Sequence, residues 1–195
     1  MAKIYLQRHT HPDIDPKICY GASDIDVRSE FESVDLPPVL RIIEGAQISK
    51  STKVYCSPLV RCRKLATEIT RREGLCQPTY DERLREISFG DWEMRPWSEI
   101  HSSEEGLKWF SNFLYERVPG GESFIDLLGR AKSFLSEIDS VSSDTLIVTH
   151  GGFMRAVLVA FELVEIDQIF TTDIVYAELI EIEIEGDKRR WRRVN

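Results

Sequence analysis

The sequence predicts an α/β domain with a largely parallel central sheet. Short apolar runs alternate along the chain with longer segments whose apolar residues recur every three or four positions, the pattern of strands alternating with helices. The predicted strands at 3–7 and 145–149 each have an uninterrupted apolar centre, at 4–6 and 146–148, which is typical of strands buried on both faces. The 195 residues contain no repeat and no linker, so we expect one domain spanning 1–195.

The first half of the chain begins with the strand at 3–7. Residues 10–38 contain four prolines and show no clean period, which predicts a long loop with at most a short helix. Loops of this length usually line a ligand site. A short helix at 39–46 and a strand at 52–56 follow. The next helix, at 58–73, has proline in its first turn, where a missing N–H removes no hydrogen bond.

The second half of the chain continues the alternation. We expect a short strand at 77–80, a loop at 81–96, helices at 104–117, 122–140 and 153–163, and strands at 145–149, 176–185 and 190–194. The loop and the helix after it carry Phe89, Trp92, Trp97 and Trp109, which either pack in the core or form the floor of a ligand pocket. The alternating strand at 176–185 is a weak indication of an edge that pairs two subunits, which leaves a homodimer open.

The charge and hydropathy of the chain disfavour two classes of partner, nucleic acids and membranes. The chain has 25 Lys and Arg against 33 Asp and Glu, and this acidic balance disfavours a nucleic-acid partner. The basic run at 188–193 is expected to be a solvated terminal strand rather than a contact with nucleic acid or an anionic surface. No apolar run is long enough to span a bilayer, and the first residues lack a signal sequence, so we expect a cytoplasmic protein without a membrane partner.

Cysteine and histidine spacing indicates neither a metal site nor a disulfide framework. The four cysteines form no C-x-x-C pair, and the four histidines are not spaced with them as a ligand set. We therefore expect free thiols and no metal or other cofactor.

Polar side chains follow three of the predicted strands where each strand ends. Arg8 and His9 end the first strand, His150 follows the strand at 145–149, and Arg61 lies in the first turn of the helix after the strand at 52–56. The carboxyl ends of parallel strands meet at one edge of a sheet, where ligands bind. Guanidinium groups match phosphate oxygens, and the glycine pair 151–152 offers N–H groups at a helix start. Each residue alone has an ordinary structural explanation, but together they predict a phosphate site.

Four motifs in this order resemble the histidine phosphatase superfamily, also called phosphoglycerate-mutase-like. They are RHT at 8–10, SPLVRCRKLA at 57–66, LREISFGDWE at 84–93 and VTHGG at 148–152. The resemblance covers about residues 3–160 and implies a three-layer α/β/α sandwich of the phosphoglycerate-mutase-like fold. Within the superfamily, Thr10 and the segment ICYGASD at 18–24 are most similar to α-ribazole phosphatases of cobalamin assembly.

The resemblance also implies roles for individual residues. His9 is the expected nucleophile, and Glu86 is the expected proton donor to the leaving group. Arg8, Arg61 and a protonated His150 are expected to hold the phosphoryl oxygens, with further phosphate contacts from Thr10, Ser57, Tyr20, Gly21 and Gly151. The nucleophile must be a neutral imidazole, which requires a backbone carbonyl or similar acceptor on its other N–H. Ser57 is also expected to cap the helix that follows it.

Some positions depart from the family pattern or have rivals. Asp15 occupies the place where many members carry a phosphate-binding Asn, and Met94 stands where most have Gly. Glu82 and Glu93 lie in the same loop as Glu86, and the residues alone do not choose among the three carboxylates.

The predicted function is a metal-independent phosphomonoesterase that works through a phosphohistidine. The resemblance favours α-ribazole 5′-phosphate or cobalamin 5′-phosphate as its substrate. The alternatives are a phosphoglycerate mutase, a broad phosphatase for small sugar or nucleotide phosphates, and a non-catalytic module that binds a phosphorylated ligand. The chain is short after Glu86, where mutases tend to be longer.

Overall fold

A central sheet of six strands organises the part of the chain described by the computed structural model, residues 2–138 and 143–194. In sheet order these strands are β3 (Thr79–Tyr80), β2 (Lys53–Cys56), β4 (Thr145–Thr149), β1 (Ala2–Arg8), β5 (Leu179–Glu185) and β6 (Lys188–Val194). The first four are parallel, β5 joins antiparallel to β1, and β6 joins antiparallel to β5. The prediction of a mostly parallel sheet is confirmed.

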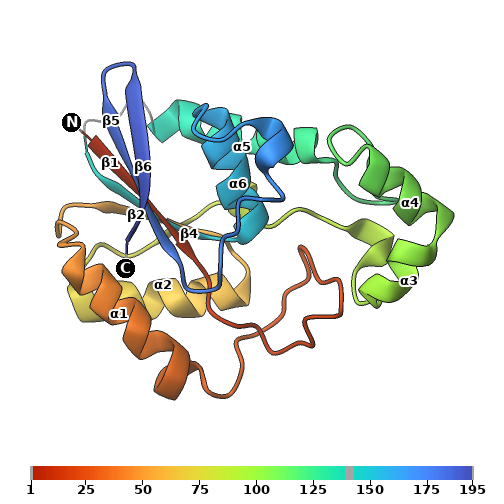
Figure 1. Cartoon of the computed structure of the whole chain (residues 1–195). Coiled ribbons are helices and arrows are strands. Elements are labelled where there is room, and N and C mark those ends of the chain that lie inside the picture. The colour runs from red at the N-terminus through yellow and green to blue at the C-terminus, as the bar shows by residue number, and fades with distance from the viewer. Residues whose placement is uncertain (1, 139–142, 195) are drawn as a thin grey trace.

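Helices cover both faces of the sheet. Figure 1 shows α1 (Leu36–Gly45) and α2 (Val60–Glu73) on one face, and α5 (Phe124–Ile138) and α6 (Gly151–Ala160) on the other. Neighbouring strand residues point to opposite faces, so Leu146 and Val148 pack toward α1 and α2 while Ile147 packs toward α5 and α6. The two buried clusters confirm the three-layer α/β/α arrangement.

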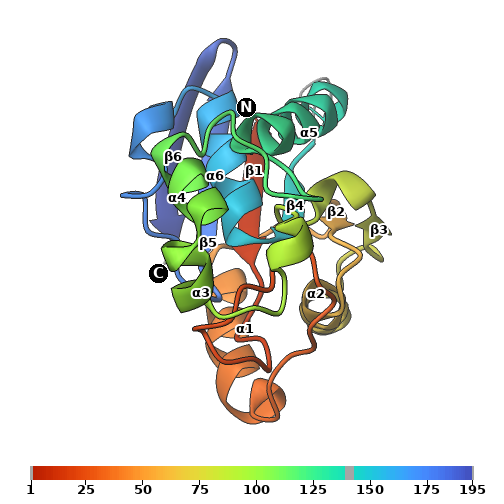
Figure 2. The ribbon, with the colours of Figure 1, turned by 90° about the vertical axis from the view of Figure 1, so that its right-hand side faces the viewer.

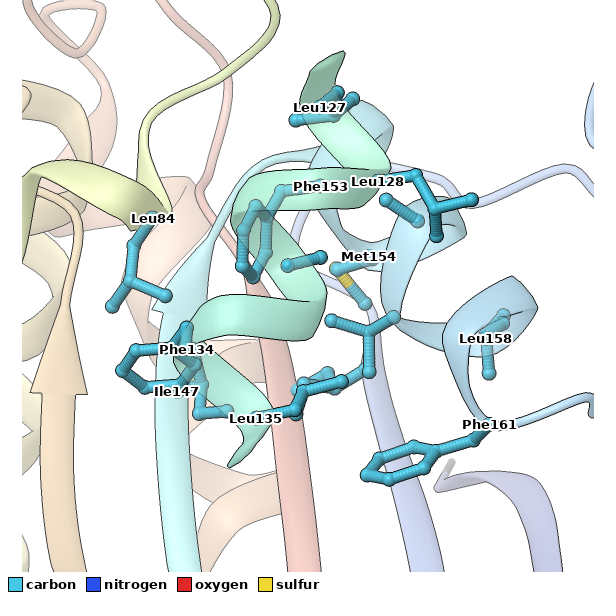
Figure 3. Close-up of a cluster of buried hydrophobic side chains, with 14 of the residues drawn as sticks. Leu84, Leu127, Leu128, Phe134, Leu135, Ile147, Phe153, Met154, Leu158 and Phe161 are labelled. Atoms are coloured by element: carbon cyan, nitrogen blue, oxygen red, sulfur yellow. The ribbon is translucent and has the colours of Figure 1, made fainter. Parts of the chain in front are cut away.

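The core between the sheet, α5 and α6 fixes the start of α6. In Figure 3, Phe134 of α5 and Phe153 of α6 lie beside Ile147 of β4. These three side chains are almost completely buried. Phe153 directly follows the glycine pair, so its packing holds the N-terminus of α6 against the end of β4. Truncating a buried phenylalanine of this kind costs about 3–5 kcal/mol of stability.

Two short helices lie apart from the sandwich. α3 (Trp97–Ser102) and α4 (Glu104–Ser111) sit beyond the end of the sheet toward which β1 runs (Figures 1 and 2). They share a third buried cluster, which includes Trp92, Ile100 and Trp109. α3 was not predicted, because six residues are too few to show a helical period.

Several element boundaries differ from the prediction. α1 begins three residues early, at Leu36, because two prolines fit in its first turn. α4 ends at Ser111 rather than at 117, and α6 begins at the glycine pair. α5 begins at Phe124 rather than at 122, and its predicted end, 139–140, lies outside the described residues.

The expected pairing edge is wrong. β5 lies inside the sheet between β1 and β6, so the edges of the sheet, as far as the chain is described, are β3 and β6. The basic residues of β6 partly neutralise acids of β5: Arg192 Nε lies 2.9 Å from Glu181 Oε1, and Glu181 is buried. Across the ranges that the structure describes, no helix has the length and apolar character needed to cross a membrane.

Candidate active site

Four of the predicted site residues converge at the carboxyl end of the parallel strands. Arg8 ends β1, His9 follows it, His150 follows β4, and Arg61 lies in the first turn of α2 after β2. The register pairs Arg8 with Thr149, which brings the two histidines to the same level. Their ring centroids are 5.0 Å apart, and Arg61 Nε lies 3.4 Å from His9 Nε2.

The surroundings of His9 fix its tautomer. His9 Nδ1 lies 2.7 Å from the carbonyl oxygen of Thr10. A carbonyl only accepts hydrogen bonds, so Nδ1 carries the proton and Nε2 keeps its lone pair. Burial, reinforced by the guanidinium groups of Arg61 and Arg8, holds the pKa of His9 well below 6.5. The result is a neutral imidazole whose free nitrogen faces the cationic groups.

His150 is also held neutral, contrary to the expectation that it is protonated. Burial, followed by the charge of the Arg61 guanidinium, lowers the pKa of His150 well below 6.5. Its Nε2 lies 2.8 Å from the hydroxyl of Ser57. A phosphoryl group brings negative charge to this point, so protonation of His150 is favoured only together with ligand binding.

Backbone carbonyls of the 10–35 loop hold the Arg61 guanidinium. Arg61 Nη1 donates to the carbonyl of Ser23 at 2.7 Å, and Nη2 donates to that of Gly21 at 2.8 Å. Gly21 has a φ of +39°, and a Cβ there would come 2.7 Å from the carbonyl oxygen of Ile87, so only glycine fits. The guanidinium lies over the ring of Tyr20, with Arg61 Cζ 5.2 Å from the ring centroid. Gly21 and Tyr20 therefore orient Arg61.

Arg8 carries a buried donor that suits an anion. Its Nη1 donates to the carbonyl of Ile174, and its Cζ lies 4.0 Å from the ring centroid of Tyr176. Its Nε and the hydroxyl of Thr10 are buried without a hydrogen-bond partner among the residues described. Buried polar groups are almost always paired, so these two groups fit a ligand with acceptor oxygens.

Tyr176 was missed by sequence reasoning because it lies in the run predicted as a strand. Its hydroxyl is 2.9 Å from that of Tyr20, and its ring centroid is 5.6 Å from that of His9. The two tyrosines therefore join the 10–35 loop to the segment before β5 beside the nucleophile.

At the start of α6, the N–H of Gly152 binds a carboxyl group of the protein itself. The N–H of Gly152 donates to Glu86 Oε2 at 3.0 Å, and the N–H of Ile87 donates to Glu86 Oε1 at 3.0 Å. The acceptor at this helix start is therefore the carboxyl group of Glu86. Gly151 packs against Arg8, since a Cβ on Gly151 would lie 3.3 Å from Arg8 Cζ.

The contacts distinguish Glu86 from its rivals. The carboxylate of Glu93 accepts hydrogen bonds from Ala22, Ser23 and Phe89, which hold it inside the loop. Glu82 is exposed and forms an ion pair with Arg85. Only Glu86, among these three, is bonded to the start of α6 beside the histidines.

Asp15, a departure from the family pattern, has a local contact, and the expected cap of α2 changes. Asp15 is exposed and accepts from the N–H of Lys17, so its contact belongs to its own turn. The carboxylate of Asp24, not the hydroxyl of Ser57, accepts from the first N–H of α2, at Val60.

An aromatic cavity of about 230 Å³ opens beside Glu86. Its walls include Phe89, Trp109 and Phe170, whereas Trp92 is buried in the cluster behind it. Trp97 instead lines a smaller cavity of about 140 Å³ with Tyr20, Gly21, Glu86 and Phe89.

Arg155 also lines the aromatic cavity and was missed. Its Nε donates to the carbonyls of Ile169 and Thr172, at 2.9 and 3.0 Å. Its spacing of four residues from Gly151 places both on one helix face, a signal that was present in the sequence. Among the residues that the structure describes, no group of three or more His, Cys, Asp or Glu side chains is arranged to hold a metal ion.

Comparison with known proteins assigns the family. The family model described as Histidine phosphatase superfamily (branch 1) matches residues 40–195. A "Putative phosphoserine phosphatase 2" of Hydrogenobacter thermophilus is 30% identical over 197 aligned positions, which cover 96% of this chain and 92% of that protein. A "Probable phosphoglycerate mutase GpmB" of Salmonella paratyphi C is 31% identical over 157 positions, covering 77% of this chain and 70% of that protein.

Solved structures share the fold at lower identity. A phosphoserine phosphatase mutant from Entamoeba histolytica in complex with phosphoserine superimposes with a TM-score of 0.83 at 18% identity, covering 100% of this chain and 97% of the other. A "putative alpha-ribazole-5'-P phosphatase" from Escherichia coli gives 0.84 at 17% identity, covering 100% and 96%. From the family model, the relatives and the convergent motifs together, the chain belongs to the histidine phosphatase superfamily.

Proposed function

We propose that this chain is a phosphomonoester hydrolase that works through a phosphohistidine at His9. The observation that carries the proposal is the orientation of His9, whose Nδ1–H is held by the Thr10 carbonyl while Nε2 faces Arg61. In the first step, Nε2 forms a bond to phosphorus and the bond from phosphorus to the substrate alcohol breaks. Glu86 gives its proton to the departing oxygen.

The second step regenerates the enzyme. Water attacks phosphorus, its proton passes to the Glu86 carboxylate, and the bond between phosphorus and His9 breaks to release phosphate. Arg8, Arg61 and His150 surround the transferring group, where they stabilise negative charge on the three equatorial oxygens. Losing one donor of this kind typically lowers the rate about 10²–10³-fold.

For the substrate we propose α-ribazole 5′-phosphate, or the related cobalamin 5′-phosphate. The aromatic cavity beside Glu86 supports this choice, because its Phe89, Trp109 and Phe170 walls suit a leaving alcohol that carries a flat ring.

A second candidate substrate is phosphoserine. Arg155 lines the same cavity, and its guanidinium matches a carboxylate on the leaving alcohol. The relative from Hydrogenobacter thermophilus bears the name of a phosphoserine phosphatase.

A substrate panel separates these candidates. Purified protein in excess EDTA is assayed for phosphate release from α-ribazole 5′-phosphate, phosphoserine and 3-phosphoglycerate, with products identified by chromatography. We expect free phosphate without added metal and the highest kcat/KM for α-ribazole 5′-phosphate. A higher kcat/KM for phosphoserine would favour the second candidate. Transfer of phosphate onto an acceptor alcohol would favour the mutase alternative.

The phosphohistidine is tested by trapping. We expect ³²P-labelled substrate to label the denatured wild-type protein with the acid lability of phosphohistidine, and His9→Ala to show neither label nor turnover. His101→Ala, which removes an exposed histidine of α3 outside the site, is the matched control and should keep the label. Full turnover by His9→Ala would rule out the phosphohistidine mechanism. Tight phosphate binding by the wild type with no label on His9 would support the binding-module alternative.

A further inference from the structure

The ion pair between Arg130 and Glu122 lies outside the group of Arg8, His9, Arg61 and His150 and holds the loop that carries Glu86. Arg130 of α5 donates through its Nη1 to the carbonyls of Arg83 and Arg85, at 2.5 and 3.0 Å. Its Nη2 donates to the carbonyl of Glu86 itself at 3.3 Å. One guanidinium therefore fixes three carbonyls on the segment that ends at Glu86.

Glu122 binds both Arg130 and the loop beyond Glu86, and we call this pair of residues the clamp. Its two carboxylate oxygens accept from Arg130 Nε at 2.7 Å and Nη2 at 2.8 Å. Its Oε2 also accepts from the N–H of Ser88 at 2.9 Å, while its own N–H donates to the carbonyl of Ser88 at 2.9 Å. The loop is thus held on both sides of Glu86.

The clamp supplies hydrogen bonds to a loop that lacks the regular backbone hydrogen bonds of a helix or strand. Residues 85–89 lie in neither a helix nor a strand, so regular structure does not set the direction of the Glu86 side chain. Hydrogen bonds to charged groups are stronger than hydrogen bonds between neutral groups. The carboxylate of Glu122 also neutralises the guanidinium, so the clamp orients Glu86 without placing a net charge beside it.

We propose that Arg130 and Glu122 are positioning residues that aim the carboxyl group of Glu86 at the leaving oxygen. The proposal rests on the proposed function, in which Glu86 is the proton donor. It assigns the pair no contact with the phosphate.

The test uses the dependence of the rate on the leaving group. p-Nitrophenol departs as a stable anion and needs little protonation, whereas an alkyl alcohol requires the acid. Alcohol release in a single turnover is measured with excess enzyme for p-nitrophenyl phosphate and for whichever of α-ribazole 5′-phosphate and phosphoserine the wild type turns over faster. Single turnover isolates the first step from hydrolysis of the phosphohistidine.

We expect Arg130→Gln to slow release from the alkyl substrate about tenfold to a hundredfold, the loss typical of a misplaced catalytic group. Release from p-nitrophenyl phosphate should change less than about threefold. Arg130→Lys and Glu122→Gln, which preserve part of the hydrogen bonding, should fall between wild type and Arg130→Gln. They also provide the measurement if Arg130→Gln does not fold.

Two controls separate the possible outcomes. Arg83→Gln breaks another contact between this loop and α5, the pair between Arg83 and Glu137, and should leave the selectivity unchanged. Glu86→Gln tests the proposed function: if it slows both substrates equally, the role of Glu86 as acid fails. If Glu86→Gln is selective but the Arg130 and Glu122 variants slow both substrates equally or neither, the positioning role alone is overturned.

Discussion

At Gly152, one missing side chain leaves room for the candidate acid. A Cβ at this position would come 2.3 Å from Glu86 Oε1, far inside contact distance. The nearest atom belongs to the end of a flexible side chain, so the chain would keep its fold and the carboxylate would move. Glycine is therefore needed here to leave room for the Glu86 carboxyl group rather than to set the backbone conformation.

Gly152→Ala should therefore lose activity without losing stability. We expect kcat on an alkyl phosphomonoester to fall about tenfold to a hundredfold because Glu86 is displaced. The thermal unfolding temperature should not fall, because alanine favours the helix over glycine by about 0.5–1 kcal/mol. Gly129→Ala in α5 is the control, because a Cβ there meets nothing within 4 Å and activity should not change. Unchanged kcat in Gly152→Ala would show that the Glu86 carboxylate need not occupy this position.

At the scale of elements, α2 and the 10–35 loop support each other. The carboxylate of Asp24 accepts from the first N–H of α2, at Val60, with a distance of 2.6 Å. The same loop provides the carbonyls of Gly21 and Ser23 that hold Arg61. A helix cap contributed from a distant loop thus also fixes the loop beside the phosphate site.

Asp24→Ala should lower both stability and substrate binding. Loss of a helix cap costs about 1 kcal/mol, and a loosened loop holds Arg61 less firmly, so KM should rise. Asp24→Asn keeps the accepting oxygen and should restore both properties. Asp26→Ala removes the neighbouring surface ion pair with Lys64 and should change stability by less than about 0.5 kcal/mol. Chemical denaturation and steady-state kinetics measure the two effects, and an unchanged KM in Asp24→Ala would separate the cap from the site.

At the scale of the whole molecule, the site lies where the two cores meet at one end of the sheet. His9, Arg61 and His150 are at most 1% exposed, so the fold keeps two neutral histidines and a guanidinium away from water. The unfolded chain exposes the same imidazoles and protonates them below pH 6.5.

Acid should therefore destabilise the fold before the carboxylates titrate. Both histidines have a lowered pKa in the folded state, so the unfolded state binds more protons below pH 6.5 and stability falls as pH falls. We expect the loss to steepen as pH falls below 6.5, toward at most about 1.4 kcal/mol per pH unit for each histidine. His150→Asn should halve this slope in denaturant titrations across the range. A flat stability curve in the wild type would contradict the buried neutral state.

Much of the fold and the centre of the site are readable from the sequence. Short apolar runs identify β1 and β4, and the residues that directly follow these two strands are His9 and His150. Tyr176 was not predicted as a site residue because its segment continues the alternation of apolar and polar residues seen in β5. In the structure this segment does not pair in the sheet. Helix α3 escaped because it is too short to show a period. The expectation of one domain over 1–195 and the roles of the site residues stay predictions.

The sequence by itself determined the α/β class, the family and the strand ends from which the cup is built, because periodicity and motifs are local properties of the chain. Only the tertiary structure decided which carboxylate reaches the cup and what holds it there. Arg130 lies 44 residues from Glu86 and acts on backbone carbonyls, which carry no side-chain signature. His150 likewise loses its expected charge through burial beside Arg61, an effect that exists only after distant segments have packed together.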